Sequence, residues 1–144
     1  MALLPSWRRC TGVSEISCWG YNVSGQLGDG GNSNQSAPVG VIGMTNATSV
    51  AAGFDNTCAL VSGGGIRCWG ANFSGQLGDG TLVNSSVPVS VAGISDATAV
   101  AVGGFHACGI VTGGGVRCWG SNAYGQLGNS TLISTSTPVP VTGL

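Results

Sequence analysis

One motif recurs three times along this chain, and its interval limits the possible folds more than any other feature. It reads CWGYNVSGQLGDG at 18–30, CWGANFSGQLGDG at 68–80 and CWGSNAYGQLG at 118–128. Both intervals are 50 residues, and the segments between the motifs are similar as well. A fixed period of this length is typical of repeat proteins, in which each unit packs against its neighbours. The architecture is therefore built from copies of one unit.

The residues within one period predict strands rather than helices. The chain has 27 Gly, four basic and five acidic residues and no Lys, whereas the wet faces of helices usually carry many Glu, Lys and Arg. Four β-rich runs occur in one period, at 88–93, 97–104, 106–112 and 115–121, and the last two flank a glycine turn. We group these runs into one sheet, with Pro88 at the start of its first strand. The predicted fold class is all-β, with β-propeller blades that are four-stranded antiparallel sheets.

The period also divides the chain into units. Counted from each CWG motif, the units are a degenerate or partial first blade at 1–17, repeats at 18–67 and 68–117, and a partial repeat at 118–144. Together they amount to about three blades, which form an incomplete ring with an uncovered face at each end. We therefore expect a fragment of a longer propeller or, if the chain is complete, self-assembly.

Six cysteines lie in pairs around the predicted hairpins, as Cys10/Cys18, Cys58/Cys68 and Cys108/Cys118. In the second pair, a three-residue loop centred on residue 63 places the two cysteines directly opposite each other, and the third pair is equivalent. At non-hydrogen-bonded cross-strand positions, Cβ atoms come close enough for a disulfide. We predict one disulfide in each hairpin, with a shortened hairpin for the first pair. Buried free thiols are the main alternative, and the spacing fits no common zinc site.

Residues that could carry catalysis or bind a metal are scattered among the units. Asp29 and Asp79 are at equivalent positions of GQLGDG, where the third copy has Asn129, so we interpret them as turn residues rather than catalytic acids or calcium ligands. His106 is the only histidine and lies two residues before Cys108, but its counterpart in the previous unit is an asparagine. Structural roles therefore fit better than a Cys–His nucleophile or a phosphate-binding glycine loop. We expect no enzyme activity and no cofactor.

A longer consensus joins these elements: G-x-x-N/H-T/A-C-A/G-L/I-V-x-G-G-G-x-R-C-W-G-x-N-x-x-G-Q-L-G, followed by P-V-x-V and A-x-x-V-A-x-G. Over residues 10–144, this pattern resembles the regulator of chromosome condensation repeat, and the paired cysteines resemble the bacterial, often secreted branch of that family. The resemblance implies a seven-bladed β-propeller, of which about three blades are present. It implies no single function, because the family includes an exchange factor for a small GTPase, a plant ultraviolet sensor and an inhibitor of β-lactamases.

Positions that stay constant between the copies are assigned to packing, and varied positions to partner binding. The constant set is the expected core of the repeat: Trp19, Trp69, Trp119, Gly25, Gly75, Gly125, Gln26, Gln76 and Gln126. The varied set gives the candidate partner-binding loops: Tyr21, Phe54, Asp55, Phe73, Phe105, His106 and Tyr124. Aromatic loop residues are good anchors for a protein or glycan partner. The alternative is that Tyr21, Phe73 and Tyr124 only cover neighbouring blades.

The predicted function is a non-catalytic, protein-binding β-propeller module, extracellular or at the cell surface. A formal net charge of −1 gives no basic face for nucleic acid, and no apolar run is long enough for membrane insertion. Disulfides favour an oxidising compartment, although the start MALLPSWRR lacks the order of a secretory signal, so a cytoplasmic location is the alternative. The alternative function is a guanine nucleotide exchange factor-like regulator of a small GTPase.

Overall fold

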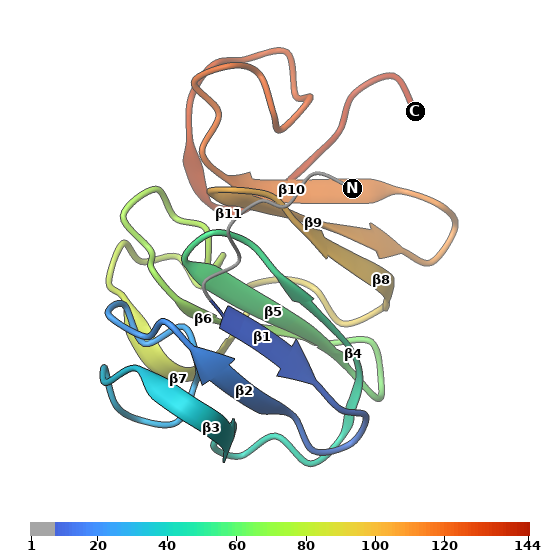
Figure 1. The fold of residues 1–144 in the computed structure, drawn as a ribbon. Helices are drawn as coiled ribbons and strands as arrows, with labels where there is room; N and C mark the ends of the chain where they lie inside the picture. The colour runs from blue at the N-terminus through green and yellow to red at the C-terminus, as the bar shows by residue number, and fades with distance from the viewer. Residues whose placement is uncertain (1–7) are drawn as a thin grey trace, which may run out of the picture.

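The computed structural model describes residues 8–144. Within this range, eleven strands form three antiparallel sheets, and there is no helix. The described residues therefore include no helix that could span a membrane. Sheet 1 consists of β1 (Arg8–Thr11), β2 (Ser17–Gly20) and β3 (Gln35–Gly40). Sheet 2 consists of β4 (Ala47–Ala52), β5 (Asn56–Val61), β6 (Ile66–Gly70) and β7 (Ser85–Ser90). Sheet 3 consists of β8 (Ala97–Val102), β9 (His106–Val111), β10 (Val116–Gly120) and β11 (Thr135–Pro140). Within each sheet, strands that follow one another in the chain pair, and the sheets stack on each other (Figure 1).

The predicted all-β fold with four-stranded blades is confirmed, but the grouping of strands within one period was wrong. The first half of the run at 88–93 falls in β7, and β7 pairs with β6 of sheet 2 instead of joining β8. A period has no intrinsic starting point, so it fixes the spacing of the strands without showing which strand begins a sheet. Each CWG motif consequently lies inside a sheet, in β2, β6 or β10. Part of the predicted first unit, residues 1–7, lies outside the described residues.

Pro88 also takes a different place from the one expected. It lies inside β7 rather than at the start of that strand. Because β7 is the outer strand of sheet 2, one of its edges has no neighbouring strand and a missing N–H there costs little. Pro38 in β3 and Pro138 in β11 occupy the same kind of position.

The predicted register of the glycine hairpins is confirmed. β5 pairs with β6 so that Cys58 lies opposite Cys68, and the turn between them contains Gly63 and Gly64 with φ of 93° and 89°. These values belong to the left-handed region, which glycine adopts without steric cost. The cysteines form three disulfides, each with a Cα–Cα distance of 4.1 Å: Cys10–Cys18, Cys58–Cys68 and Cys108–Cys118.

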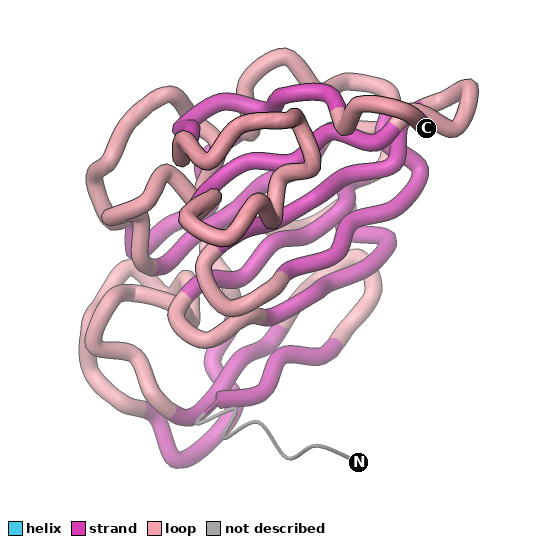
Figure 2. The backbone as a smooth tube through the Cα atoms, turned by 90° about the horizontal axis from the view of Figure 1, so that it is seen from above, coloured by secondary structure: helices cyan, strands magenta, loops and turns pink. Residues whose placement is uncertain are grey.

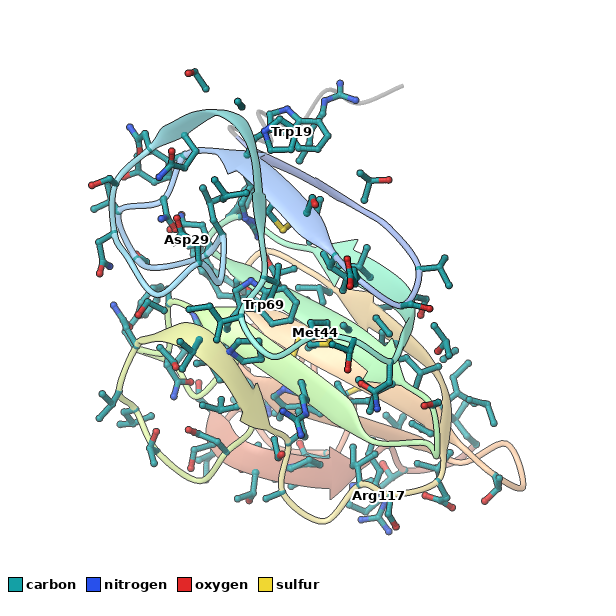
Figure 3. All side chains as sticks on the ribbon, turned by 90° about the horizontal axis from the view of Figure 1, so that it is seen from below. Trp19, Asp29, Met44, Trp69 and Arg117 are labelled. Carbon is teal, nitrogen blue, oxygen red and sulfur yellow. A yellow bond between two sulfur atoms is a disulfide. The ribbon has the colours of Figure 1, made fainter. Side chains whose placement is uncertain are left out.

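A tryptophan fills the space between each pair of neighbouring sheets. Trp69 is fully buried between sheets 1 and 2, and Trp119 between sheets 2 and 3. Each indole lies against a glycine of the preceding sheet's long loop, since a Cβ on Gly28 would be 2.8 Å from Trp69 Nε1 and one on Gly78 would be 2.7 Å from Trp119 Nε1. Figure 3 shows Trp69 and Met44 together in the first of these cores. The sheets are therefore held together by a contact that repeats with the sequence.

Candidate functional site

The long loops of all three sheets lie at the same end of the molecule. In a meander, successive connections fall at opposite ends of the sheet and every second connection falls at the same end. The loops 21–34, 71–84 and 121–134 therefore share one end with the tight turns 53–55 and 103–105. We call this the long-loop end, and we call the opposite end, which carries the glycine turns of the hairpins, the hairpin end. Figure 2 shows the strands running through the molecule between these two groups of loops. The seven candidate partner-binding residues all lie in or beside the connections of the long-loop end.

Each long loop is organised by one buried asparagine. In the loop of sheet 2, Asn72 Oδ1 accepts a hydrogen bond from Leu77 N at 2.9 Å. Its Nδ2 group donates to Asp79 Oδ1 at 3.2 Å, Thr81 O at 3.0 Å and Val83 O at 3.1 Å. Equivalent bonds are made in the other two loops by Asn22 and Asn122. The loops are long but built to a common shape, so they can present side chains in fixed positions.

The aspartates of GQLGDG take part in the same loop structure. Asp79 Oδ1 accepts hydrogen bonds from Thr81 N at 3.0 Å and Thr81 Oγ1 at 2.8 Å. Asn129 Oδ1 makes the same two bonds to Thr131, at 3.2 and 2.9 Å. An amide oxygen thus replaces the carboxylate, so the position requires an acceptor rather than a negative charge. Within residues 8–144, no three His, Cys, Asp or Glu side chains gather in a way that could hold a metal ion.

Three phenylalanines, the only ones in the chain, meet at the long-loop end. Phe54 comes from the turn between β4 and β5, Phe105 from the turn between β8 and β9, and Phe73 from the long loop of sheet 2. The ring centroid of Phe105 is 5.7 Å from that of Phe54 and 5.3 Å from that of Phe73, and both pairs are tilted. The exposed fractions are 38% for Phe54, 57% for Phe73 and 38% for Phe105. We call these residues the phenylalanine cluster.

The phenylalanine cluster is not a feature of every repeat. Its members come from three different positions of the period, and each position has another residue in a neighbouring copy. Phe54 corresponds to Gly104, Phe105 to Asp55, and Phe73 to Val23 and Ala123. Gly104 also provides the space, because a Cβ there would be 2.8 Å from the Phe54 ring. The cluster therefore exists only where sheet 2 meets sheet 3.

Each sheet places a polar residue opposite the glycine of its CWG motif, in the pairs Arg8–Gly20, Asn56–Gly70 and His106–Gly120. Arg8 is 3% exposed, and its Nη2 group donates to Gly53 O at 3.2 Å and to the carbonyl oxygen of Asn56. Burial lowers the pKa of Arg8 to about 10, while the charge of Asp55 acts in the opposite direction. Arg8 thus links sheet 1 to sheet 2 near the long-loop end.

His106 and Asp55, both predicted for partner binding, have contacts inside the molecule. The His106 ring lies against Gly103, where a Cβ would be 2.3 Å from the ring atom Cε1, and burial lowers the pKa of this imidazole below its usual value. Asp55 Oδ1 accepts a hydrogen bond from Gln26 Nε2 at 3.1 Å. Cys108 is in a disulfide, so no thiol is available beside His106 for a Cys–His nucleophile.

The two tyrosines lie on other loops of the long-loop end. Tyr21 is 36% exposed and follows β2, while Tyr124 is 91% exposed in the loop after β10. Of the predicted aromatic residues, the structure brings together Phe54, Phe73 and Phe105.

Sequence reasoning missed Arg8, because an overlay by 50 residues aligns it with a cysteine. The shorter spacing of Cys10 and Cys18 already indicated that the first hairpin is two residues shorter, and a corrected overlay aligns Arg8 with Asn56.

Stacked meander sheets made from one repeated sequence, with a tryptophan between neighbours, define a segment of a β-propeller. The family described as the regulator of chromosome condensation (RCC1) repeat matches the chain at residues 16–60, 64–110 and 113–144. A second description of the same repeat matches residues 47–76 and 97–126. The chain belongs to the RCC1 repeat family, as its motifs indicated. No curated protein matches it.

Solved structures with the same fold include yeast, human and plant proteins of low identity. Prp20p from Saccharomyces cerevisiae has a TM-score of 0.81 and 19% identity over 90% of this chain and 34% of its own. Human WBSCR16 has a TM-score of 0.79 and 24% identity over 92% of this chain and 35% of its own. The ectodomain of the Physcomitrella patens receptor kinase CR4 has a TM-score of 0.51 and 21% identity over 80% of this chain and 27% of its own. The chain thus spans about a third of these structures or less, and the likeness shows the fold alone.

Proposed function

We propose that the chain is a non-catalytic protein-binding module whose partner docks at the long-loop end. The observation that carries this proposal is the convergence of Phe54, Phe73 and Phe105 while each ring remains more than a third exposed. Exposed aromatic surface is unfavourable in water, so burying it against a partner contributes favourably to the free energy of binding. Clustered aromatic side chains also dominate the affinity of many protein interfaces.

The composition of the long loops supports an uncharged contact surface on the partner. Further apolar side chains are exposed on the long loops: Leu82, Val83, Leu132 and Ile133, with exposed fractions of 63%, 70%, 69% and 74%. With four basic and five acidic residues in the whole chain, there is little charge to attract a strongly acidic or basic partner. The partner expected is therefore a protein with an apolar patch.

Two solved relatives give support at the level of the fold. One structure of Prp20p is described with the binding of that protein to Gsp1p and histones, and another contains Kap60 bound to it. The same fold is thus used for protein contacts elsewhere, although the partner of this chain has to be recognised by its own loops. For the location, the three disulfides support an oxidising compartment, outside the cell or at its surface.

The test is affinity capture by the immobilised chain, with the extracellular and the cytosolic fractions of the source organism offered separately. The triple variant Phe54→Ser, Phe73→Ser, Phe105→Ser should retain a true partner at least about tenfold less than the wild type, because three anchoring rings are removed. Val13→Ser is the matched control, since Val13 is 72% exposed at the hairpin end. It should leave retention unchanged.

The outcome that contradicts the proposal is a set of retained proteins that is the same for the wild type and the triple variant. Val13→Ser should unfold in urea within about 0.5 kcal/mol of the wild type. The triple variant loses the packing of Phe54 and Phe105, which are each 38% exposed, so it should unfold more easily by about 2–4 kcal/mol and is compared only under conditions where urea unfolding shows that it is folded. Retention from the cytosolic fraction alone would support the binding role and contradict the proposed location.

A further inference from the structure

Six of the nine asparagines in this chain stand in the tripeptide Asn-x-Ser/Thr, the acceptor sequence for N-linked glycans in the eukaryotic secretory pathway. We call each such tripeptide a sequon. The sequons begin at Asn22, Asn34, Asn46, Asn72, Asn84 and Asn129. An N-linked glycan replaces one hydrogen of the Nδ2 group, so a folded protein can carry it only where that group faces solvent. The structure therefore separates sequons that tolerate a glycan from sequons that do not.

Two sequons belong to asparagines that hold the long loops together, and we call them the buried sequons. Asn22 and Asn72 are fully buried. Asn22 Nδ2 donates to Asp29 Oδ1 at 3.1 Å, to Gly31 O at 3.1 Å and to Ser33 O at 3.0 Å, and Asn72 makes equivalent bonds. Figure 3 labels Asp29 within the first of these loops. The amide hydrogens point into the loop, so a sugar on either nitrogen would break these bonds and keep the loop from forming.

The other sequons can carry a glycan without losing hydrogen bonds of this kind. Asn46 is exposed in the connection between β3 and β4. Asn34 and Asn84 are also exposed, and each uses Oδ1 to accept a bond from a backbone N–H, at 2.8 Å. The partly buried Asn129 likewise accepts through Oδ1, from Asn122 Nδ2 at 3.2 Å. A glycan on Nδ2 leaves the oxygen in place as an acceptor. We call the sequons at 34, 46 and 84 the exposed sequons.

The third copy of the motif shows that the serine of a buried sequon is not needed for the loop. The residue equivalent to Ser24 and Ser74 is Tyr124, so Asn122 is not in a sequon, yet Asn122 makes the same set of bonds. In all three copies the backbone N–H of this position donates to a glutamine Oε1 at 2.8 Å. A buried sequon can therefore be removed at its serine while the asparagine that the loop requires is kept.

Burial in the folded chain does not protect these asparagines from glycan transfer, because transfer comes first. In the endoplasmic reticulum, the oligosaccharide is attached to the extended chain as it enters the lumen. The acceptors of Asn72 Nδ2 lie between 7 and 11 residues further along the chain, so the loop cannot close around the amide until they have entered as well. A glycan attached at that stage persists during folding, and a chain that cannot fold is retained and degraded.

We propose that this chain folds in an oxidising compartment where no glycan is transferred to Asn-x-Ser/Thr, such as the bacterial periplasm, and that transfer to Asn22 or Asn72 blocks its folding. The inference rests on the proposed location and narrows it. Three disulfides favour an oxidising environment, which includes both the periplasm and the lumen of the endoplasmic reticulum. The buried sequons are incompatible with the second of these compartments.

The test compares the 144-residue chain exported to a bacterial periplasm with the same chain carried by an added export signal into the endoplasmic reticulum of a eukaryotic cell. The periplasmic wild type should be folded, with its three disulfides and without glycans. In the eukaryotic cell, peptide mass spectrometry should find glycans on Asn22 and Asn72 of the wild type. The double variant Ser24→Ala, Ser74→Ala should be secreted folded, and the wild type at least about tenfold less, since only the variant lacks the buried sequons.

The matched control is Ser36→Ala, Thr48→Ala, Ser86→Ala, which removes the exposed sequons, keeps the buried ones and should be retained like the wild type. Secretion of folded wild type at the level of Ser24→Ala, Ser74→Ala would overturn the inference. So would failure of both proteins in the eukaryotic cell when both fold in the periplasm, because the glycans would then not be the cause. Failure of the proposed location gives a different result: the wild type would fold equally well in a reducing cytosol with six free thiols.

Discussion

At the scale of single residues, small differences between the copies change the hydrogen bonds of the sheet contacts. In the contact between sheets 1 and 2, Thr57 Oγ1 donates to Gln26 O at 2.9 Å. The equivalent of Thr57 in the next contact is Ala107, which has no hydroxyl, and there Trp119 Nε1 donates to Gln76 O at 3.1 Å. The carbonyl oxygen is thus satisfied in both contacts by different donors, as expected for a buried acceptor.

A second difference concerns the glutamine side chains and the phenylalanine cluster. Gln26 Nε2 donates to Asp55 at 3.1 Å, but the residue equivalent to Asp55 in sheet 3 is Phe105. Gln76 Nε2 is buried and has no partner within residues 8–144. An unsatisfied buried donor is unfavourable, so the aromatic ring at 105 is obtained at a cost in stability. Such a cost is typical of a residue retained for binding rather than for folding.

We therefore predict that Phe105→Asp is more stable than Phe105→Ala, by about 1 kcal/mol. Both variants lose the aromatic contacts, but the aspartate restores the acceptor that Gln76 lacks. Urea unfolding of the two variants provides the comparison. Equal stability, or a less stable aspartate variant, would show that Gln76 gains nothing from a carboxylate at 105. Both variants should bind the partner less tightly than the wild type.

His106 should make stability depend on pH below neutrality. Burial lowers its pKa below the usual value of 6.5, so the folded chain favours the neutral ring, while the unfolded chain takes up a proton near pH 6.5. The stability that comes from this difference is complete above that pH and is lost as the pH falls through the folded pKa. Because His106 is the only histidine, His106→Asn should lose less stability than the wild type in urea unfolding between about pH 7.5 and about pH 5. Identical losses for the two proteins would contradict this assignment.

At the scale of elements, the long loops owe their shape to one side chain each. Asn72 is fully buried and bonds to Leu77, Asp79, Thr81 and Val83 across its loop. Asn72→Ala removes these bonds and leaves backbone groups unpaired, so we expect unfolding to become easier by about 2–4 kcal/mol. Thermal or urea unfolding measures the change.

Two control substitutions distinguish the loss of this buried network from the loss of one exposed hydrogen bond or of a charge. Asn32→Ala removes one exposed hydrogen bond, to Val23 O, and should change stability by no more than about 0.5 kcal/mol. Asp79→Asn should also remain within about 0.5 kcal/mol, because Asn129 makes the equivalent bonds in the third copy. A large loss in Asp79→Asn would mean that the charge itself is required, as in a calcium site.

The elements could be predicted from the sequence to the extent that local rules determine them. The glycine turns and the spacing of Cys58 and Cys68 gave the hairpin, its register and its disulfide, because all three depend on residues close together in the chain. The assignment of 88–93 to the following sheet was wrong because neighbouring copies look alike whichever strand is taken as the first. Only the pairing of β7 with β6 resolves that choice.

The candidate site was predictable as a set of residues but not as an arrangement. Comparison of the copies selected Phe54, Phe73 and Phe105 because these positions vary. Their meeting depends on how sheet 3 sits on sheet 2 and on the space left by Gly104, which no local pattern contains. Arg8 was missed for the opposite reason, since a shift of two residues in the first hairpin hides its equivalence to Asn56.

At the scale of the whole molecule, stability depends on glycines that let an indole approach the backbone. Gly78 and Gly93 both have φ of +69°, but a Cβ on Gly78 would be 2.7 Å from Trp119, whereas nothing lies within 4 Å of one on Gly93. Alanine at either position meets the same backbone cost of about 1 kcal/mol. Gly78→Ala should therefore be less stable than Gly93→Ala by about 1–3 kcal/mol, from crowding of the indole. Equal losses in urea unfolding would show that the tryptophan does not pack there.

The central claim is that successive repeats stack as propeller blades, and that each tryptophan between two blades packs on a glycine and apolar side chains of the blade before. NMR distance contacts of the Trp69 and Trp119 indole protons test it most directly. The account predicts contacts from Trp69 to Gly28 and Val41, and from Trp119 to Gly78 and Val91, with slow exchange of the Trp119 indole N–H that bonds to Gln76 O. Indole contacts limited to residues of the same hairpin, with rapid exchange of that N–H, would contradict it.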